Sequence, residues 1–276
     1  MSAAPSGQAP GGLPVPPAPP VPPRLPVRRG LYEPVVGQLT YRTLLGRRRA
    51  LLLGIIPGLL LVLAAAIRYW GEVNGGRSLG LLDPFALTIV VPLVALIAGT
   101  TAIGPEIDDG SIVYLMAKPL SRFTIANSKY IVGAGVATVF GAGATLLAGI
   151  ILASGADTMR VAVAMTVAAL LAGWAYVAIF LVLAVYTRVA VVIGLIYIVV
   201  WEGLVSGLIV GAQQLSVHQW ALAVAERVLG ARAAESVGLD SPVSFVAGVV
   251  LLAVFTVGSV VLAGWRLRSA RLTSDE

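Results

Sequence analysis

The sequence predicts an all-α protein that crosses a membrane several times. Of its 276 residues, 58% are hydrophobic and only 12% are charged, whereas soluble domains carry roughly 25% charged residues. The mean hydropathy is correspondingly high, at +0.93. Several apolar runs also reach about 18 residues or more, the helix length that crosses the hydrocarbon core of a bilayer. These three observations together predict a polytopic bundle of transmembrane helices.

Residues 1–30 form a low-complexity segment rich in Pro, Gly and Ala. Proline lacks the backbone donor that helices and sheets need, so we expect a disordered or polyproline II tail in the cytoplasm. A ligand for an SH3-like domain is the alternative interpretation. Residues 31–49 instead predict an amphipathic helix lying on the inner membrane surface. Arginines 42 and 47–49 supply its basic side, and its apolar side consists of Val35, Val36, Leu39, Tyr41, Leu44 and Leu45.

The membrane domain is expected to cover residues 50–268 and to hold six spans, at 50–67, 84–103, 130–153, 161–186, 189–211 and 243–265. A cleaved signal peptide is the alternative for the first span, but its apolar run is too long for a signal core. Residues 212–242 form the one long external connection. We expect a short helix there that caps the bundle, with Trp220 at the membrane interface. A helix that encloses the exit of a pathway is the alternative.

The orientation follows from the distribution of the basic residues. Of the 19 Lys and Arg residues, all but five fall on the side of the two termini; those five are Arg68, Arg77, Arg160, Arg227 and Arg232. Because cytoplasmic loops carry the excess of Lys and Arg, both termini are predicted to be cytoplasmic. The net charge of +6 therefore reflects topology, and we expect no nucleic-acid partner.

Several classes of enzyme are disfavoured by the residues present. The absence of cysteine and the single histidine, His218, exclude thiolate chemistry and a His/Cys metal centre. Neither Lys118 nor Lys129 follows a Gly-rich turn, as the lysine of a phosphate-binding loop would. The aspartates lie outside the predicted spans, where they cannot serve intramembrane proteolysis. We expect neither an enzyme nor a bound cofactor in this chain.

Glu202 is the ionisable residue that lies well inside a predicted span, and Ser206 shares its helix face. A carboxylate at membrane depth is costly, so it should face the protein interior or water. One interpretation is a contact on the substrate path, and the other is a carboxyl group bonded to a neighbouring helix. Beside it, Gly203, Gly207 and Gly211 repeat every fourth residue, a pattern that permits close helix approach. A subunit interface and packing within one bundle both fit this stripe.

Residues 104–129 hold the densest mixed-charge stretch of the chain. Glu106, Asp108 and Asp109 follow Pro105, at a place where a helix N-terminus favours negative charge. Pro119 then interrupts the helix, and a second helix begins near Ser121 and runs into the third span. A solvated loop would explain the basic residues alone. The carboxylates, the central proline and the aliphatic residues together predict a cytoplasmic helical hairpin that docks to another protein.

This hairpin resembles the cytoplasmic loop of ABC-2 type permeases, the transmembrane subunits of bacterial ABC exporters. In that family an acidic pair precedes Gly-Ser/Thr, and a Pro-x-Ser-Arg turn and a basic residue follow. The matching residues are Glu106, Asp108, Asp109, Gly110 and Ser111, then Lys118, Pro119, Ser121 and Arg122, and finally Lys129. The resemblance covers about residues 31–270. The proline-rich extension and Ser111, where threonine is commoner, depart from the pattern.

The resemblance implies a permease of the bacterial cell membrane in which two such chains, identical or paralogous, join two ATP-binding subunits. ATP and magnesium would bind only the partner subunits. The hairpin would be the coupling element, with Glu106, Asp108 and Asp109 meeting basic residues of the ATPase and with Pro119 and Arg122 fixing its shape. A membrane scaffold that recruits a cytoplasmic protein without transport is the alternative. A stand-alone carrier is disfavoured because the sequence shows no internal repeat.

Overall fold

The computed structural model describes residues 30, 32–44, 46–108, 121–205 and 210–269. Within these residues every regular element is a helix. Five described helices are long and apolar enough to cross a membrane: Leu53–Trp70, Gly75–Ile107, Arg122–Leu152, Ala156–Tyr186 and Phe245–Arg268. A further apolar helix, Ala190–Val205, is shorter and covers part of the predicted fifth span. The all-α polytopic architecture is confirmed, and five of the six predicted spans correspond to helices of full length.

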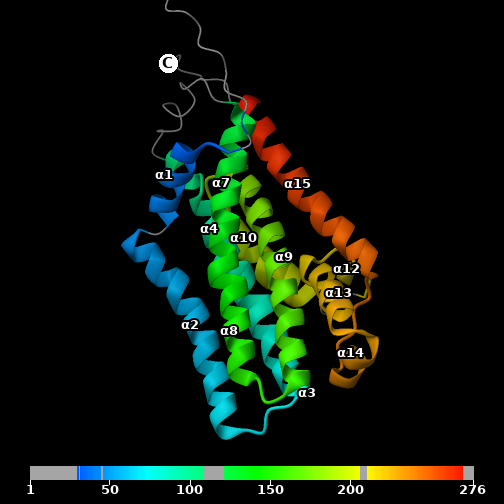
Figure 1. Cartoon of the computed structure of the whole chain (residues 1–276). Coiled ribbons are helices and arrows are strands. Elements are labelled where there is room, and N and C mark those ends of the chain that lie inside the picture. The colour runs from blue at the N-terminus through cyan, green and yellow to red at the C-terminus, as the bar shows by residue number, and fades with distance from the viewer. Residues whose placement is uncertain (1–29, 31, 45, 109–120, 206–209, 270–276) are drawn as a thin grey trace, which may run out of the picture.

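Figure 1 shows how these helices are arranged. One end of the bundle, here termed the α1 end, gathers α1, the start of α7 and the end of α15, while α3 and the end of α2 lie at the opposite end. The elements, in order, are α1 (Pro34–Leu44), α2 (Arg47–Trp70), α3 (Gly75–Leu81), η1 (Leu82–Val90), α4 (Val91–Thr101), α5 (Gly104–Asp108), α7 (Arg122–Ala137), η2 (Thr138–Ala142), α8 (Gly143–Leu152), α9 (Ala156–Tyr186), α10 (Ala190–Ile196), η3 (Tyr197–Val205), α12 (Val210–Gln213), α13 (Val217–Leu229), α14 (Ala231–Val237) and α15 (Phe245–Ser269). The η elements are π-helical.

Helix α9 forms the centre of the bundle and packs against α4, α8, α13 and α15. Small residues allow these helices to approach α9 closely. A Cβ atom added at Gly99 of α4 would lie 2.9 Å from the Phe180 Cβ atom, and one added at Gly149 of α8 would lie 2.4 Å from the Ala162 Cβ atom. Gly99 of the second span and Gly149 of the third therefore serve packing within the chain, because a larger side chain at either position would force the helices apart.

The predicted surface helix at residues 31–49 is divided in two. Helix α1 ends at Leu44, and α2 begins at Arg47, so arginines 47–49 belong to the following helix. The apolar residues of α1 also lie on two faces. Val36 and Leu44 are buried in the protein, whereas Val35, Leu39 and Tyr41 are exposed. Helix α1 packs against α7 with one face and leaves an apolar face open.

The connection at residues 212–242 does not merely cap the bundle. Its main helix, α13, packs against α9 and α15 and is buried over most of its length. Trp220 is only 1% exposed, and its ring centroid lies 4.8 Å from that of Phe255. The expectation that Trp220 anchors at the membrane interface is wrong, since its ring belongs to the protein core.

Candidate functional site

The described residues include both ends of the predicted coupling hairpin. Helix α5 (Gly104–Asp108) contains its first residues, and Ser121 and α7 contain its last. Asp109, Gly110, Ser111, Lys118 and Pro119 lie outside the described residues, as does the side chain of Asp108. The geometry of the site is therefore the geometry of its two attachments to the bundle.

Lys129 joins these two ends from inside the protein. Its side chain is 1% exposed, and its ammonium group pairs with the Glu106 carboxylate on α5. The same Nζ atom donates a hydrogen bond of 2.6 Å to the carbonyl oxygen of Ala102, at the C-terminus of α4. A cation is favourable there because the last carbonyls of a helix carry a partial negative charge.

This arrangement differs from what the resemblance implies, in which Glu106 meets basic residues of the ATPase and Lys129 belongs to the same docking segment. Lys129 is buried, so it cannot contact another protein in this conformation. Glu106 is 18% exposed and is engaged by Lys129. Sequence spacing alone could not reveal the pair, because it depends on how α4, which leads into α5, packs against α7. The two residues fasten the beginning of the hairpin to its end.

Ser121 begins α7 as its N-cap, as the sequence predicts for the second helix of the hairpin. Its Oγ atom accepts a hydrogen bond of 3.0 Å from the Thr124 backbone N–H. The Thr124 hydroxyl in turn donates to the carbonyl oxygen of Gly30. Four residues further on, Ser128 Oγ accepts a bond of 2.9 Å from the backbone N–H of Glu33. The chain that leads into α1 is therefore fixed to the start of α7.

Arg122 occupies the first position of α7, where the helix dipole disfavours a positive charge. One guanidinium nitrogen, Nη1, is buried without a hydrogen-bond partner among the residues that the structure describes. A buried donor without an acceptor is destabilising. Neither its positive charge nor this unpartnered donor stabilises the start of α7.

Glu202 lies at the opposite half of the bundle, in the π-helical segment η3, and is 4% exposed. Its carboxylate accepts hydrogen bonds from the Tyr197 hydroxyl at 2.9 Å, from the Val217 backbone N–H at 3.2 Å and from the Ser216 hydroxyl. Ser216 is the N-cap of α13, and the helix dipole stabilises a negative charge at this position. These bonds fit the interpretation of a carboxyl group bonded to a neighbouring helix. Ser206 lies outside the described residues.

Asp83 was not singled out by the sequence analysis. Its Oδ1 atom lies 2.7 Å from Nε2 of His218, so η1 is joined to α13 at the residue that directly follows the Glu202 contacts. Asp83 directly precedes the predicted second span, while His218 was assigned to an external loop. The sequence offered one signal for this contact: Asp83 and the single histidine of the chain are both predicted near the same side of the membrane. It became informative only once α13 was placed inside the bundle.

The glycine stripe beside Glu202 is not used for packing in the described part of the chain. Gly203 is exposed, and a Cβ atom there would meet only the Ile198 carbonyl oxygen, at 3.7 Å. A Cβ atom on Gly211 would meet nothing within 4 Å, and Gly207 lies outside the described residues. The segment packs against the rest of the protein through a different face, whose buried residues are Ala190, Gly194, Ile198 and Glu202.

Comparison with protein families places these features in a known class. Residues 45–225 match the family described as ABC-2 family transporter protein, so the match covers most of the chain. It includes both the Lys129–Glu106 pair and the contacts of Glu202 with α13. A search of curated proteins finds no match. The chain belongs to the ABC-2 family of transporter proteins and is a permease of that family.

Proposed function

We propose that this chain is the permease subunit of an ATP-driven exporter and that residues 104–129 receive the force of a separate ATP-binding subunit. The observation that carries this proposal is the Lys129–Glu106 pair. Because it joins α5 to α7, a partner that displaces the hairpin moves the helices Gly75–Ile107 and Arg122–Leu152 together. Transport requires this kind of link between ATP binding and the arrangement of the spans.

The α1 end faces the cytoplasm in this proposal, so both termini lie inside a bacterial cell. Arginines at that end support the assignment. Arg266 lies over the Tyr186 ring at 5.2 Å from its centroid, and Arg268 lies over the Phe123 ring at 5.8 Å. Packed arginines at one end of a bundle agree with the excess of basic residues that cytoplasmic loops carry.

We assign the contacts with the ATPase to the middle of residues 104–129 and to Arg122. Arg122 begins α7 and is only half-buried, so the accessible part of its side chain can meet an acceptor on the partner. Asp108, Asp109, Gly110, Ser111, Lys118 and Pro119 form the remainder of the predicted contact. ATP and magnesium bind the partner alone. Glu106 and Lys129 hold the hairpin in place, and Ser121 begins its second helix.

The proposal is tested by purifying the tagged chain from its native membrane in mild detergent and assaying the material for ATP hydrolysis. We expect a stoichiometric ATP-binding subunit that hydrolyses ATP. Arg122→Glu should abolish this activity or the association, while leaving the chain folded because an acidic residue favours a helix N-terminus. The matched control is Arg160→Glu, at the other end of the bundle, which should change neither. A chain that purifies alone, or with a partner that does not hydrolyse ATP, would support the scaffold alternative.

We assign the stripe of Gly203, Gly207 and Gly211 to the contact between two permease chains. The exposure of Gly203 and the open space at Gly211 favour this assignment over packing within one chain. Nearby side chains that would share the contact are apolar and exposed, including Val199, Val200 and Leu204. Two such faces meet through small residues at a short helix separation.

A further inference from the structure

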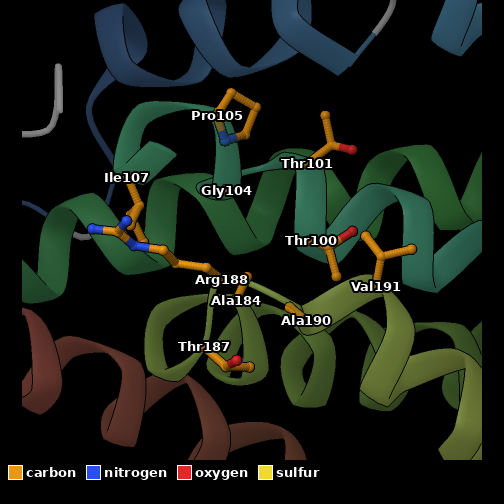
Figure 2. A pocket seen from close by; sticks show the side chains of 10 residues that line it. All are labelled: Thr100, Thr101, Gly104, Pro105, Ile107, Ala184, Thr187, Arg188, Ala190 and Val191. Carbon is orange, nitrogen blue, oxygen red and sulfur yellow. The ribbon is translucent and has the colours of Figure 1, made fainter. Parts of the chain in front are cut away.

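A cavity of about 300 Å³ opens at the α1 end, between the turn that joins α4 to α5 and the turn that joins α9 to α10. Figure 2 shows the Arg188 side chain running from the α9–α10 turn toward Ile107 of α5, with Thr100 and Val191 on the other side. The cavity combines one cation, three hydroxyl groups and small apolar residues. Its lining consists of Thr100, Thr101, Gly104, Pro105, Ile107, Ala184, Thr187, Arg188, Ala190 and Val191.

The charge of this cavity is positive. None of the described residues that line it is acidic, and Arg188 makes no ion pair with another described residue. Glu106 stands between two lining residues, but its carboxylate is neutralised by Lys129. The guanidinium of Arg188 is therefore available to an anion, and a guanidinium is well suited to bind a phosphate group.

The threonines add a hydrogen-bond donor beside this cation. Thr187 Oγ1 accepts a bond of 3.2 Å from the Val189 backbone N–H, so its own hydroxyl hydrogen remains free to donate. Thr100 is different, because its hydroxyl already donates to the Leu96 carbonyl oxygen at 2.6 Å. An anion in the cavity would thus meet the Arg188 guanidinium and the Thr187 hydroxyl, which are neighbours in the sequence.

An apolar surface continues from the cavity along α10. Val191, Val192, Leu195 and Ile196 are each exposed, between 46% and 57%. In a membrane this surface meets acyl chains, and the positive cavity stands at its headgroup end. The ligand that matches both parts has an anionic phosphate head and an apolar tail.

We propose that this cavity binds the phosphate of an anionic phospholipid through Arg188 and Thr187, with the acyl chains lying along α10. The proposal rests on the proposed function in one respect: that function places this lipid in the cytoplasmic leaflet. The bound lipid contacts both the α9–α10 turn and Gly104 and Pro105 at the start of the coupling hairpin. It therefore braces the hairpin against the helix that follows α9.

The test is native mass spectrometry of the purified full chain after exchange into detergent that contains phosphatidylglycerol or phosphatidylcholine. We expect retained phosphatidylglycerol on the wild-type chain and about fivefold less on Arg188→Gln, the effect of one basic residue at an anionic surface. Arg188→Lys should retain an intermediate amount. Arg160→Gln, an exposed arginine at the opposite end, should retain as much as the wild type.

Three results would overturn the proposal: equal retention by Arg188→Gln, equal retention of phosphatidylcholine, or displacement of the lipid by inorganic phosphate. The last would indicate a site for a small soluble anion. Lipid retention is measured without any ATP-binding subunit. A chain that retains phosphatidylglycerol but associates with no ATPase would therefore contradict the proposed function and leave the lipid site standing.

Discussion

Single residues carry the links between elements in this protein, and the ion pair of Lys129 with Glu106 is the clearest. A buried ion pair is seldom a large net source of stability, because both charges lose their hydration. Replacing only one of the two residues is nevertheless destabilising, because the other charge is then left without its partner. The pair therefore acts mainly to specify the position of α5 relative to α7, and a double-mutant cycle can measure this coupling.

Glu106→Leu and Lys129→Leu should each destabilise the chain, by about 3 kcal/mol where a buried charge is left unpaired. The double variant should be destabilised by clearly less than the sum, because it leaves no unpaired charge. The measurement is thermal unfolding of the three purified variants in one detergent. Additive effects would show that the two side chains do not interact.

Glu202 offers a separate test at the residue scale. Its carboxylate accepts bonds from Ser216 and Val217, at the start of α13, and from Tyr197. Glu202→Ala would leave those buried donors unsatisfied, and we expect a loss of about 2 kcal/mol in unfolding free energy. Glu202→Gln keeps one acceptor oxygen and should lose less. A Glu202→Ala chain as stable as the wild type would instead favour the substrate-path interpretation.

At the scale of elements, close packing against α9 depends on glycines at defined positions. Gly149→Ala would place a methyl group within 2.4 Å of the Ala162 Cβ atom and 3.0 Å of its Cα atom. We expect a loss of about 1 to 3 kcal/mol, the usual effect of overpacking. The matched control is Gly135→Ala in the same span, where a Cβ atom meets nothing within 4 Å. Thermal unfolding of the two variants should separate them, and equal midpoints would contradict the packing argument.

The sequence predicted the elements unevenly, for reasons that individual residues make plain. Spans made of continuous apolar residues were predicted with nearly correct bounds. The predicted span 161–186, for example, corresponds to α9, which covers Ala156–Tyr186. The second long helix begins at Gly75, whereas its span was predicted to begin at residue 84. The prediction started too late because the glycines and Arg77 of α3 are not typical of a membrane span. The π-helical segments were not predicted, since their i→i−5 bonds leave no periodic signal in the residues.

The coupling site at residues 104–129 stays a prediction, because residues 109–120 lie outside the described part of the chain. Charge clustering and the central proline identified residues 104–129 as the segment of interest. Burial of Lys129 and the contact of Glu202 with α13 depend on residues far away in the chain, so no local pattern encodes them. Helix α13 shows the same limit, because an amphipathic pattern does not reveal whether water or protein covers the helix.

At the scale of the whole molecule, the assembly of two permease chains can be tested directly, because the chain contains no cysteine. Gly203→Cys should form a disulfide-linked dimer when membranes are oxidised, since the glycine stripe is assigned to the contact between chains. The control is Leu59→Cys on α2, which is 70% exposed and lies outside that stripe. Electrophoresis without reductant gives the answer. Cross-linking at Leu59 but not at Gly203 would place the interface elsewhere.

The hydrogen bonds of Gly30 and Glu33 to α7 determine where the proline-rich segment joins the bundle. That junction stands beside Ser121, at the end of the coupling hairpin. A protein that recognised the proline-rich segment would thereby be tethered next to the hairpin, at a local concentration on the order of millimolar. Under the proposed function, even a protein that binds this segment weakly would then compete with, or reinforce, the docking of the ATPase.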